Sequence, residues 1–344
     1  MPPEPPSAAA GPATPPPSPE EAEILAFIAE VERFYPPEAV GAPVDQQRRW
    51  YDALCRNFDA PLPAGLTVEA ASARHPAGPV PLRRYRPATL RRTAGQGAAI
   101  VYFHGGGFVV GGLDSHNAVC AELAEAAGAE LAAVDYRLAP EHRFPLALTD
   151  CLAAVLAEAA GGGRPLVVAG DSAGGSLAAG VAMVLRDAGR AVPAALTLLQ
   201  AAGWRAGTAL PRLVGQALIY PVLGGALDRG SYREMAAAPG LTTHDVRYYR
   251  EILGAPEGDP YGHPLAASDW AGLPPAYITA AHFDPLRDDG RHYAARLAEA
   301  GVDVAYREEP QMVHAWLRAR HRSPGAKAGF DALCRGVSWL LDGA

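Results

Sequence analysis

Short apolar runs alternate with helical patterns from about residue 98 onward, and few architectures accept such an alternation. The runs contain almost no polar side chain, whereas the segments between them carry apolar residues at helical spacing. A strand that is apolar on both faces is buried on both sides, which happens when helices cover a parallel sheet. The sequence therefore predicts an α/β fold with a mostly parallel central sheet flanked by helices.

Two strands are expected before this alternation, at Thr67–Ala73 and Val80–Arg86. The apolar strands are expected at Ala98–Phe103, Leu131–Asp135, Leu166–Ala169, Gly215–Tyr220, Ala276–Ala281 and Val302–Tyr306. The accompanying helices are expected at Asn117–Ala127, Pro145–Ala160, Ser176–Ala188, Tyr293–Ala300 and Ala326–Leu341. Residues 190–213 break the rhythm, since both 194–200 and 214–220 could form the next strand. The later piece is preferred because Tyr220-Pro221 ends it cleanly, and the earlier piece is then an insertion.

The composition excludes several classes of protein. Hydrophobic residues make up 49% of the 344 residues and charged residues 19%, which is enough to bury a large core. The net charge of -7 argues against a nucleic-acid partner, which would need a basic face. The four cysteines form no C-x-x-C pair, so we expect no metal, and buried free thiols in a reducing compartment. Neither a long apolar stretch nor a signal peptide is visible, which predicts a cytoplasmic protein without a membrane partner.

A candidate nucleophile follows the apolar strand Leu166–Ala169. Residues 170–175 read GDSAGG and precede a helical pattern, so Ser172 occupies a G-x-S-x-G turn between strand and helix. This nucleophile elbow strains the serine backbone so that the hydroxyl projects above the sheet edge, and only small neighbours permit the turn. The alternative is a glycine-rich turn without chemistry, but the flanking strand and helix favour the elbow. Asp171 is expected to hydrogen-bond to backbone or polar groups near the turn.

A glycine run supplies a candidate oxyanion hole. Residues 104–108 read HGGGF directly after a predicted strand. Acyl transfer builds negative charge on the carbonyl oxygen, and backbone N–H groups can reach that oxygen only where no side chain blocks them. The candidate donors are the N–H groups of Gly105, Gly106, Gly107 and Ala173. His104 is interpreted as a hydrogen-bonding residue of this loop, and a dinucleotide fingerprint is not matched because Val110 stands where its third glycine belongs.

In these motifs the chain resembles the bacterial hormone-sensitive-lipase-like family (family IV) of α/β hydrolases. The resemblance is carried by HGGGF, DYRLAPEHRFP at residues 135–145, GDSAGG, and DPLRDDG at residues 284–290, in the family's order. It runs from about residue 80 to residue 341. It implies an α/β-hydrolase fold with a helical cap and a carboxylic ester hydrolase that favours short acyl chains. Glu141, in the second motif, is interpreted as a supporting residue behind the site.

The family resemblance and the sequence patterns together predict three parts of the chain: a tail, cap helices and a hydrolase core. Residues 1–19 are dense in proline and small residues and are expected to form a disordered tail. Residues 20–65 carry two helical patterns before any strand and are expected to form cap helices. Residues 66–344 form the expected hydrolase core, and residues 225–263 within it are expected to contribute to the cap.

Chain order selects the partners of Ser172. A serine needs a histidine to take its proton and an acid to orient that histidine, and in this fold class the order is Ser, acid, His. Asp284 and His314 each follow a predicted strand, at the sheet edge where open α/β sheets build their sites. The resemblance points to the same two residues. The family usually has Gly-Phe after the histidine, so Trp316 here could narrow the substrate pocket.

Other acids and histidines offer weaker alternatives. Asp288 and Asp289 stand where a helix starts and are expected to cap it, while His282 precedes the acid against the chain order. His321 falls in or beyond the following helix. His142, in PEHRFP, is interpreted as a residue that shapes its loop. The other histidines are expected at the surface or in loops: His75, His116, His244, His263 and His292.

The sequence thus predicts a serine carboxylesterase that acts through a Ser-His-Asp triad and an acyl-enzyme on short-chain esters. No cofactor or metal is expected. The expected partner is a small-molecule ester, with a homodimer as a further possibility. The alternatives are a non-catalytic binder, as in the plant gibberellin receptors that this family resembles, and an amidase or lipase. The receptors replace the catalytic histidine, whereas His314 is present here.

Overall fold

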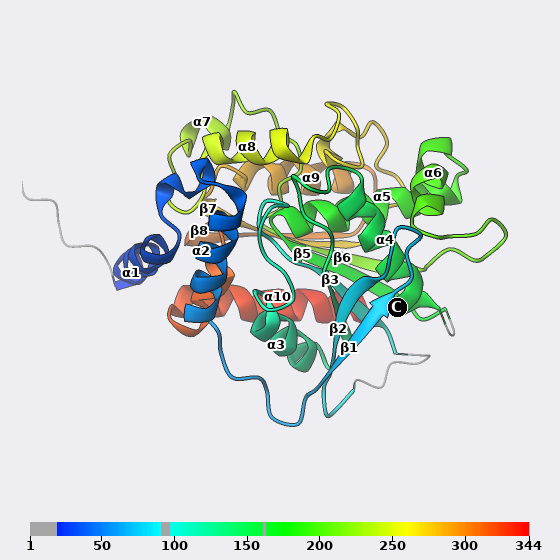
Figure 1. The fold of residues 1–344 in the computed structure, drawn as a ribbon, viewed down its shortest axis with the longest axis horizontal. Coiled ribbons are helices and arrows are strands. Elements are labelled where there is room, and N and C mark those ends of the chain that lie inside the picture. The colour runs from blue at the N-terminus through cyan, green and yellow to red at the C-terminus, as the bar shows by residue number, and fades with distance from the viewer. Residues whose placement is uncertain (1–18, 91–96, 161–162, 344) are drawn as a thin grey trace, which may run out of the picture.

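An eight-stranded sheet forms the centre of the computed structural model, which describes residues 19–90, 97–160 and 163–343 (Figure 1). The strands are β1 (Thr67–Ala73), β2 (Val80–Arg86), β3 (Ala99–Phe103), β4 (Leu131–Val134), β5 (Leu166–Asp171), β6 (Leu213–Ile219), β7 (Ala276–Phe283) and β8 (Val304–Val313). Their order across the sheet is β1-β2-β4-β3-β5-β6-β7-β8. The pairs β1–β2 and β2–β4 are antiparallel, and every other neighbouring pair is parallel. The predicted fold class is confirmed.

Helices cover both faces of the sheet, as Figure 1 shows. The α-helices are α1 (Pro19–Phe34), α2 (Val44–Asn57), α3 (Asn117–Ala127), α4 (Leu146–Ala159), α5 (Ala173–Gly189), α6 (Pro193–Ala201), α7 (Ser231–Glu234), α8 (Thr243–Leu253), α9 (Arg287–Glu299) and α10 (Pro324–Asp342). Three short 3₁₀ helices are η1 (Pro37–Gly41), η2 (Pro264–Ala266) and η3 (Trp316–His321). Helices α4, α5 and α9 pack on one face, and α3 and α10 pack on the other.

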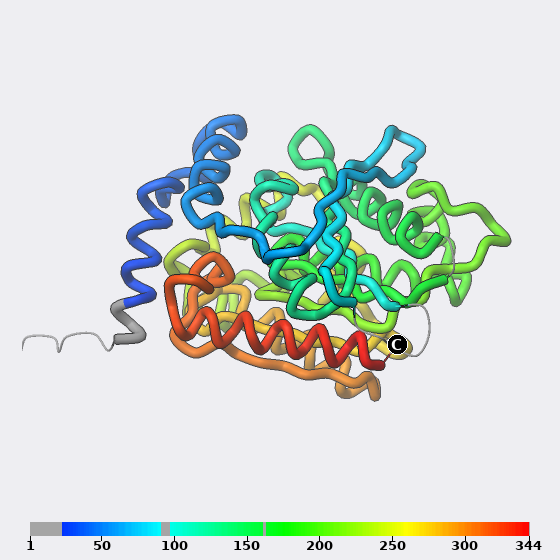
Figure 2. Tube along the Cα trace, turned by 90° about the horizontal axis from the view of Figure 1, so that it is seen from below, coloured from blue at the N-terminus to red at the C-terminus, as the bar shows by residue number. Residues whose placement is uncertain are grey.

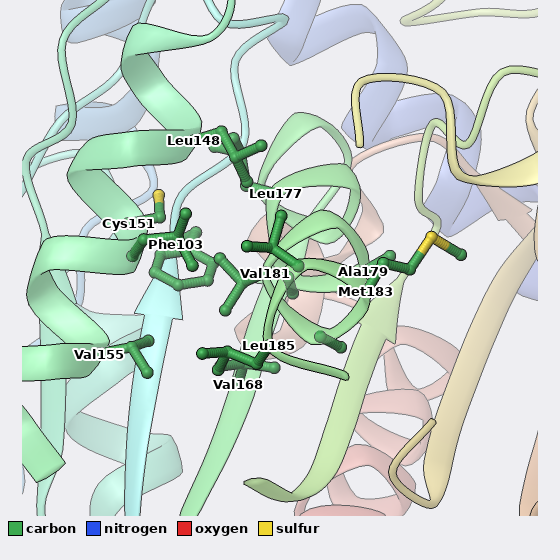
Figure 3. Packing of buried hydrophobic residues seen from close by; sticks show 14 of the residues in the cluster. Phe103, Leu148, Cys151, Val155, Val168, Leu177, Ala179, Val181, Met183 and Leu185 are labelled. Carbon is green, nitrogen blue, oxygen red and sulfur yellow. The ribbon is translucent and has the colours of Figure 1, made fainter. Parts of the chain in front are cut away.

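The side chains of β3 show how one strand serves both layers. Val101 and Phe103 pack toward α4 and α5, whereas Ile100 and Tyr102 pack toward α3 and α10. Figure 3 shows Phe103 among the aliphatic side chains of α4 and α5. Burial of each large apolar side chain contributes about 1.5–3 kcal/mol, which fixes this central strand and the loop that follows it.

Segments distant in sequence lie together above the carboxyl ends of the strands. The tube in Figure 2 places α1 and α2 at one end of the molecule. The Tyr35 hydroxyl lies 3.5 Å from that of Tyr249, and Gln47 Nε2 donates to the Tyr248 hydroxyl at 3.0 Å. Helix α2 and the residue that directly follows α1 therefore contact α8.

The segment between α5 and β6 contains a helix instead of a strand. Helix α6 follows α5, and buried Ala195 and Leu199 attach it to the core. Strand β6 begins at Leu213, so the preference for the later strand candidate is confirmed. The predicted tail falls on residues 1–19, of which residues 1–18 lie outside the described part of the chain.

All four cysteines are buried and none is in a disulfide, as their spacing indicates. Among the described helices, none has the length and apolarity needed to cross a membrane.

Candidate active site

Ser172 occupies a sharp turn between β5 and α5. Its backbone has φ 54° and ψ -115°, and its N–H donates to the carbonyl of Ile219 at 2.8 Å. A Cβ at Gly174 would overlap the carbonyl of Phe103, and one at Gly170 would overlap the carbonyl of Gly174. The glycines are therefore needed for the chain to turn this tightly against β3, and the strain directs the serine side chain out of the sheet.

His314 and Asp284 complete a continuous line of hydrogen bonds with Ser172. His314 Nε2 lies 2.9 Å from Ser172 Oγ, and His314 Nδ1 lies 2.7 Å from Asp284 Oδ2. Asp284 is fully buried, and its other oxygen accepts the N–H of Leu286 at 2.8 Å. A carboxylate beside Nδ1 favours the tautomer with the proton there, which leaves Nε2 free to accept the serine proton.

The glycine loop after β3 places backbone amides beside the serine. Gly106 has φ 128° and Gly107 has φ 59°, and both line the same cavity as Ser172. A Cβ at Gly106 would overlap the carbonyl of Val110, and one at Gly107 would overlap the ring of Tyr249. Within the described ranges, no acceptor is hydrogen-bonded to the amides of Gly106, Gly107 and Ala173, so all three remain candidate donors.

Gly105 does not fit the same role. Its N–H donates to Asp171 Oδ1 at 2.9 Å, which corrects its inclusion among the candidate oxyanion donors. Asp171 also accepts the Tyr102 hydroxyl at 2.8 Å and lies 3.2 Å from His116 Nε2. Asp171, the residue before Ser172, therefore ties the glycine loop to the nucleophile elbow.

The charge of Asp171 is stabilised inside the core. Burial alone would raise its pKa, but His116, the charge of Arg318 and the hydrogen bond from Tyr102 hold the pKa well below its usual value. His116 was expected at the surface or in a loop, and it does precede α3 in a loop. It is nevertheless buried, because its imidazole faces this carboxylate. His75 is likewise buried, beside Asp150.

His104 lies in the loop without touching Ser172. Its Nδ1 is 2.8 Å from the carbonyl of Gly105, and its ring stacks on Tyr136 at 4.2 Å between centroids. Burial, together with the neighbouring His116, lowers the pKa of His104 to about 4. His104 is therefore a neutral, packed residue at neutral pH.

The expectation for Trp316 is wrong, whereas that for Glu141 stays a prediction. The half-exposed side chain of Glu141 pairs with Arg48 of α2 at 2.7 Å, and Arg48 donates to the carbonyl of Val109 in the loop beside the site. Trp316 was expected to narrow the pocket. It is fully buried against Tyr220 and Gly329, because the positive φ of Ala315 turns the chain inward after the histidine.

The acids after Asp284 hold a loop instead of capping a helix. Asp289 Oδ2 accepts the N–H of Leu223 at 2.7 Å and the Tyr232 hydroxyl at 3.0 Å. Asp288 accepts the N–H of Ser231 at 2.8 Å. The cap position of α9 is Leu286, which has no capping side chain. The rival histidines have other partners: His282 faces Glu308, and His321 faces Glu122.

A cavity of about 110 Å³ opens above Ser172. Its walls come from the strand ends, the glycine loop and the helices above them. Sequence patterns did not single out the lining residues Tyr51, Arg250 and Arg318. Arg318 stands four residues after His314, and that proximity to the predicted base is the one available signal.

A larger cavity of about 650 Å³ lies elsewhere, beside β2 and β4. It is lined by charged residues such as Arg84, Glu130 and Arg164, and it contains none of the groups around Ser172. The small cavity is therefore the candidate active site. Among the described residues, no cluster of histidine, cysteine or acidic side chains could hold a metal ion.

Comparisons with known proteins give the same picture. Residues 100–318 match a family model described as the α/β hydrolase fold. The chain is 37% identical over 268 residues to the esterase LipI of Mycobacterium tuberculosis, covering 75% of this chain and 77% of that protein. It is 39% identical over 248 residues to an ethyl acetate hydrolase of Pseudomonas putida, covering 70% and 72%. A crystal structure of a mutant of the esterase rPPE superposes with a TM-score of 0.81 at 28% identity, covering 95% and 99%.

The sheet order, the elbow and the serine beside a histidine define a hydrolase of the α/β type. The chain belongs to the α/β hydrolase family and, within it, to the hormone-sensitive-lipase-like branch (family IV) of carboxylic ester hydrolases.

Proposed function

We propose that the protein hydrolyses short-chain carboxylic esters through the triad Ser172, His314 and Asp284. The observation that carries this proposal is the hydrogen-bonded line from Ser172 Oγ through the imidazole to the buried carboxylate. Each member comes from the carboxyl end of a different parallel strand, so the rigid sheet holds their mutual geometry.

The chemistry follows from this geometry. Ser172 Oγ attacks the ester carbonyl while His314 Nε2 takes its proton, and Asp284 stabilises the imidazolium that forms. The amides of Gly106, Gly107 and Ala173 donate to the oxygen that becomes negatively charged. His314 then returns the proton to the leaving alcohol. Water, deprotonated by the same imidazole, releases the acid from Ser172.

The size of the cavity supports a small acyl group. An apolar cavity of about 150 Å³ engineered in another protein accommodates benzene, and the cavity above Ser172 measures about 110 Å³. A relative named for ethyl acetate hydrolysis also acts on a short ester. We further propose that residues 20–65 and 225–263 form a cap that limits the length of the bound chain.

A ladder of p-nitrophenyl esters from acetyl to lauryl tests the proposal with wild type and Ser172→Ala. We expect a short-chain optimum in the wild type and loss of activity by at least about 10³-fold in the variant. Ser338→Ala, on α10 away from the elbow, is the matched serine control. Full activity in Ser172→Ala would refute the triad. No turnover of any ester by the folded wild type would favour a binder or an amidase.

A further inference from the structure

Two arginines line a cavity that is otherwise mostly apolar. Arg318 enters from η3, beside the triad histidine, and Arg250 enters from α8. The other ionisable lining residues are His314, Glu32, which is exposed on α1, and Asp171 below the serine. A pocket meant only for neutral, short acyl chains has no need of two guanidinium groups.

Neither arginine is paired with a carboxylate in the described ranges of the chain, within 4.0 Å. Arg318 donates to the Tyr51 hydroxyl, and its guanidinium lies 4.9 Å from the centre of that ring. Arg250 donates to the Tyr232 hydroxyl at 2.9 Å, and its Nε is buried without a hydrogen-bond partner. Both guanidinium groups therefore retain unused donors.

Asp171 and Asp289 feel the charges of Arg318 and Arg250, but neither carboxylate contacts an arginine directly, and both accept their hydrogen bonds from other groups. Asp171 accepts from Tyr102, Gly105 and His116, and Asp289 accepts from Tyr232 and from the backbone at 223–225. These contacts anchor the glycine loop and the loop after β6. Neither carboxylate can turn toward an arginine without releasing the loop that it holds.

A charged group inside a poorly hydrated cavity is costly unless it is paired. A guanidinium presents a planar fork of N–H donors that matches a carboxylate, and such charge-assisted bonds are about twice as strong as neutral ones. We propose that the enzyme prefers esters that carry a free carboxylate, which Arg318 and Arg250 bind. This inference rests on the proposed ester hydrolysis at Ser172. The carboxylate can belong to the acid half, as in dicarboxylic half-esters, or to the alcohol half, as in esters of hydroxy acids.

Matched pairs of substrates test this specificity and distinguish the two halves. Mono-p-nitrophenyl glutarate is compared with p-nitrophenyl pentanoate, and 3-acetoxypropanoate is compared with propyl acetate. The readout is the ratio of kcat/KM for the anionic ester to that for its neutral match. We expect a ratio of at least about 10 in one pair for the wild type, since hydrogen bonds between charged groups are about twice as strong as neutral ones.

The variants Arg318→Met and Arg250→Met should each lower that ratio at least about fivefold. Because the ratio is taken within one variant, a general loss of active protein cancels. Arg318→Lys keeps the positive charge but loses the planar fork of donors, so its ratio should lie between those of the wild type and Arg318→Met. This variant provides the test if Arg318→Met folds poorly. Arg233→Met, which removes an exposed arginine of α7, is the control and should leave the ratio unchanged.

Three outcomes overturn the inference. A wild-type ratio at or below 1 in both pairs rejects the anionic substrate, and an unchanged ratio in both arginine variants rejects the assigned residues. In both cases neutral esters are still hydrolysed in a Ser172-dependent manner, so the proposed function stands. If the wild type hydrolyses neither member of either pair, the proposed function fails as well.

Discussion

The floor and the roof of the active-site cavity are held in different ways. The floor consists of the ends of β5, β7 and β8 and the glycine loop, and buried hydrogen bonds such as those of Asp284 and Asp171 position it. The roof consists of α1, α2 and α8, which meet through aromatic side chains, and the half-exposed pair of Arg48 and Glu141 joins α2 to the loop before α4.

This difference assigns different tasks to the two regions. A buried polar group that loses its partner has no water to replace it, so floor contacts are costly to break and hold the geometry tightly. Exposed ion pairs contribute about 0–1 kcal/mol, so the roof is held more loosely. We therefore expect floor variants to change the chemical step and roof variants to change substrate binding.

The largest expected effect is at the centre of the floor. Asp284→Asn keeps the shape but disfavours the tautomer of His314 that accepts the serine proton, so kcat should fall by about 10³–10⁴ with little change in KM. Steady-state kinetics on a short p-nitrophenyl ester measure both constants. Asp303→Asn, at an exposed position before β8, is the matched control. Retention of more than about a tenth of kcat would mean that another acid orients the histidine.

A smaller effect is expected where the floor meets the roof. A Cβ at Gly107 would overlap the Tyr249 ring of α8, so Gly107→Ala must shift the loop amide away from the developing oxyanion. Loss of about 10²-fold in kcat/KM is expected, and adding Tyr249→Ala should recover part of it. Gly258→Ala places the same methyl at a positive φ in open space and should leave kinetics unchanged. If kcat/KM does not recover in the double variant, backbone strain at position 107 accounts for the whole loss, and the overlap with Tyr249 does not.

Sequence patterns were sufficient for the fold and for the places of the three residues proposed as the triad, and both successes have one physical reason. Apolar periodicity locates strands, and an open α/β sheet builds its site where parallel strands end, so motifs at those points come together. Ser172, Asp284 and His314 all stand at such points.

Sequence patterns could not predict which of these side chains are buried or which residues distant in sequence contact one another. His116 stands in a loop, and only the folded chain brings Asp171 to it. Gly105 is identical to its neighbours in sequence, and only its contact with the same carboxylate separates it from them. Trp316 was misplaced because the turn at Ala315 is a backbone property without a sequence signature.

The free energy of unfolding at acidic pH tests how tightly the floor is held around His104. The pKa of His104 is about 4 in the fold, below its ordinary value of 6.5, so between these values the unfolded chain binds the proton more readily. The stability that His104 contributes is complete above pH 6.5 and is lost as the pH falls toward 4. On the order of 2 kcal/mol should be lost from this group between pH 7.5 and pH 5.

His104→Asn should reduce that loss, as measured by urea unfolding at both pH values. The pH difference within each variant is compared, so a constant cost of the substitution cancels. His244→Asn, at an exposed position on α8, should leave the pH dependence unchanged. An identical slope in His104→Asn and wild type would show that other groups, such as buried His75 or partly buried His263, account for the acid sensitivity.

The smallest effect is expected in the roof. Arg48→Ala removes two hydrogen bonds to Glu141, at 2.8 and 2.7 Å, and donors to the carbonyls of Val109 and Ala139. The free energy of unfolding should fall by about 1 kcal/mol, and KM should rise about two- to threefold with kcat nearly unchanged. Exchanging the charges in Arg48→Glu/Glu141→Arg should restore part of the binding. A tenfold fall in kcat would instead mean that helix α2 positions the reacting groups, and the division between floor and roof would then be wrong.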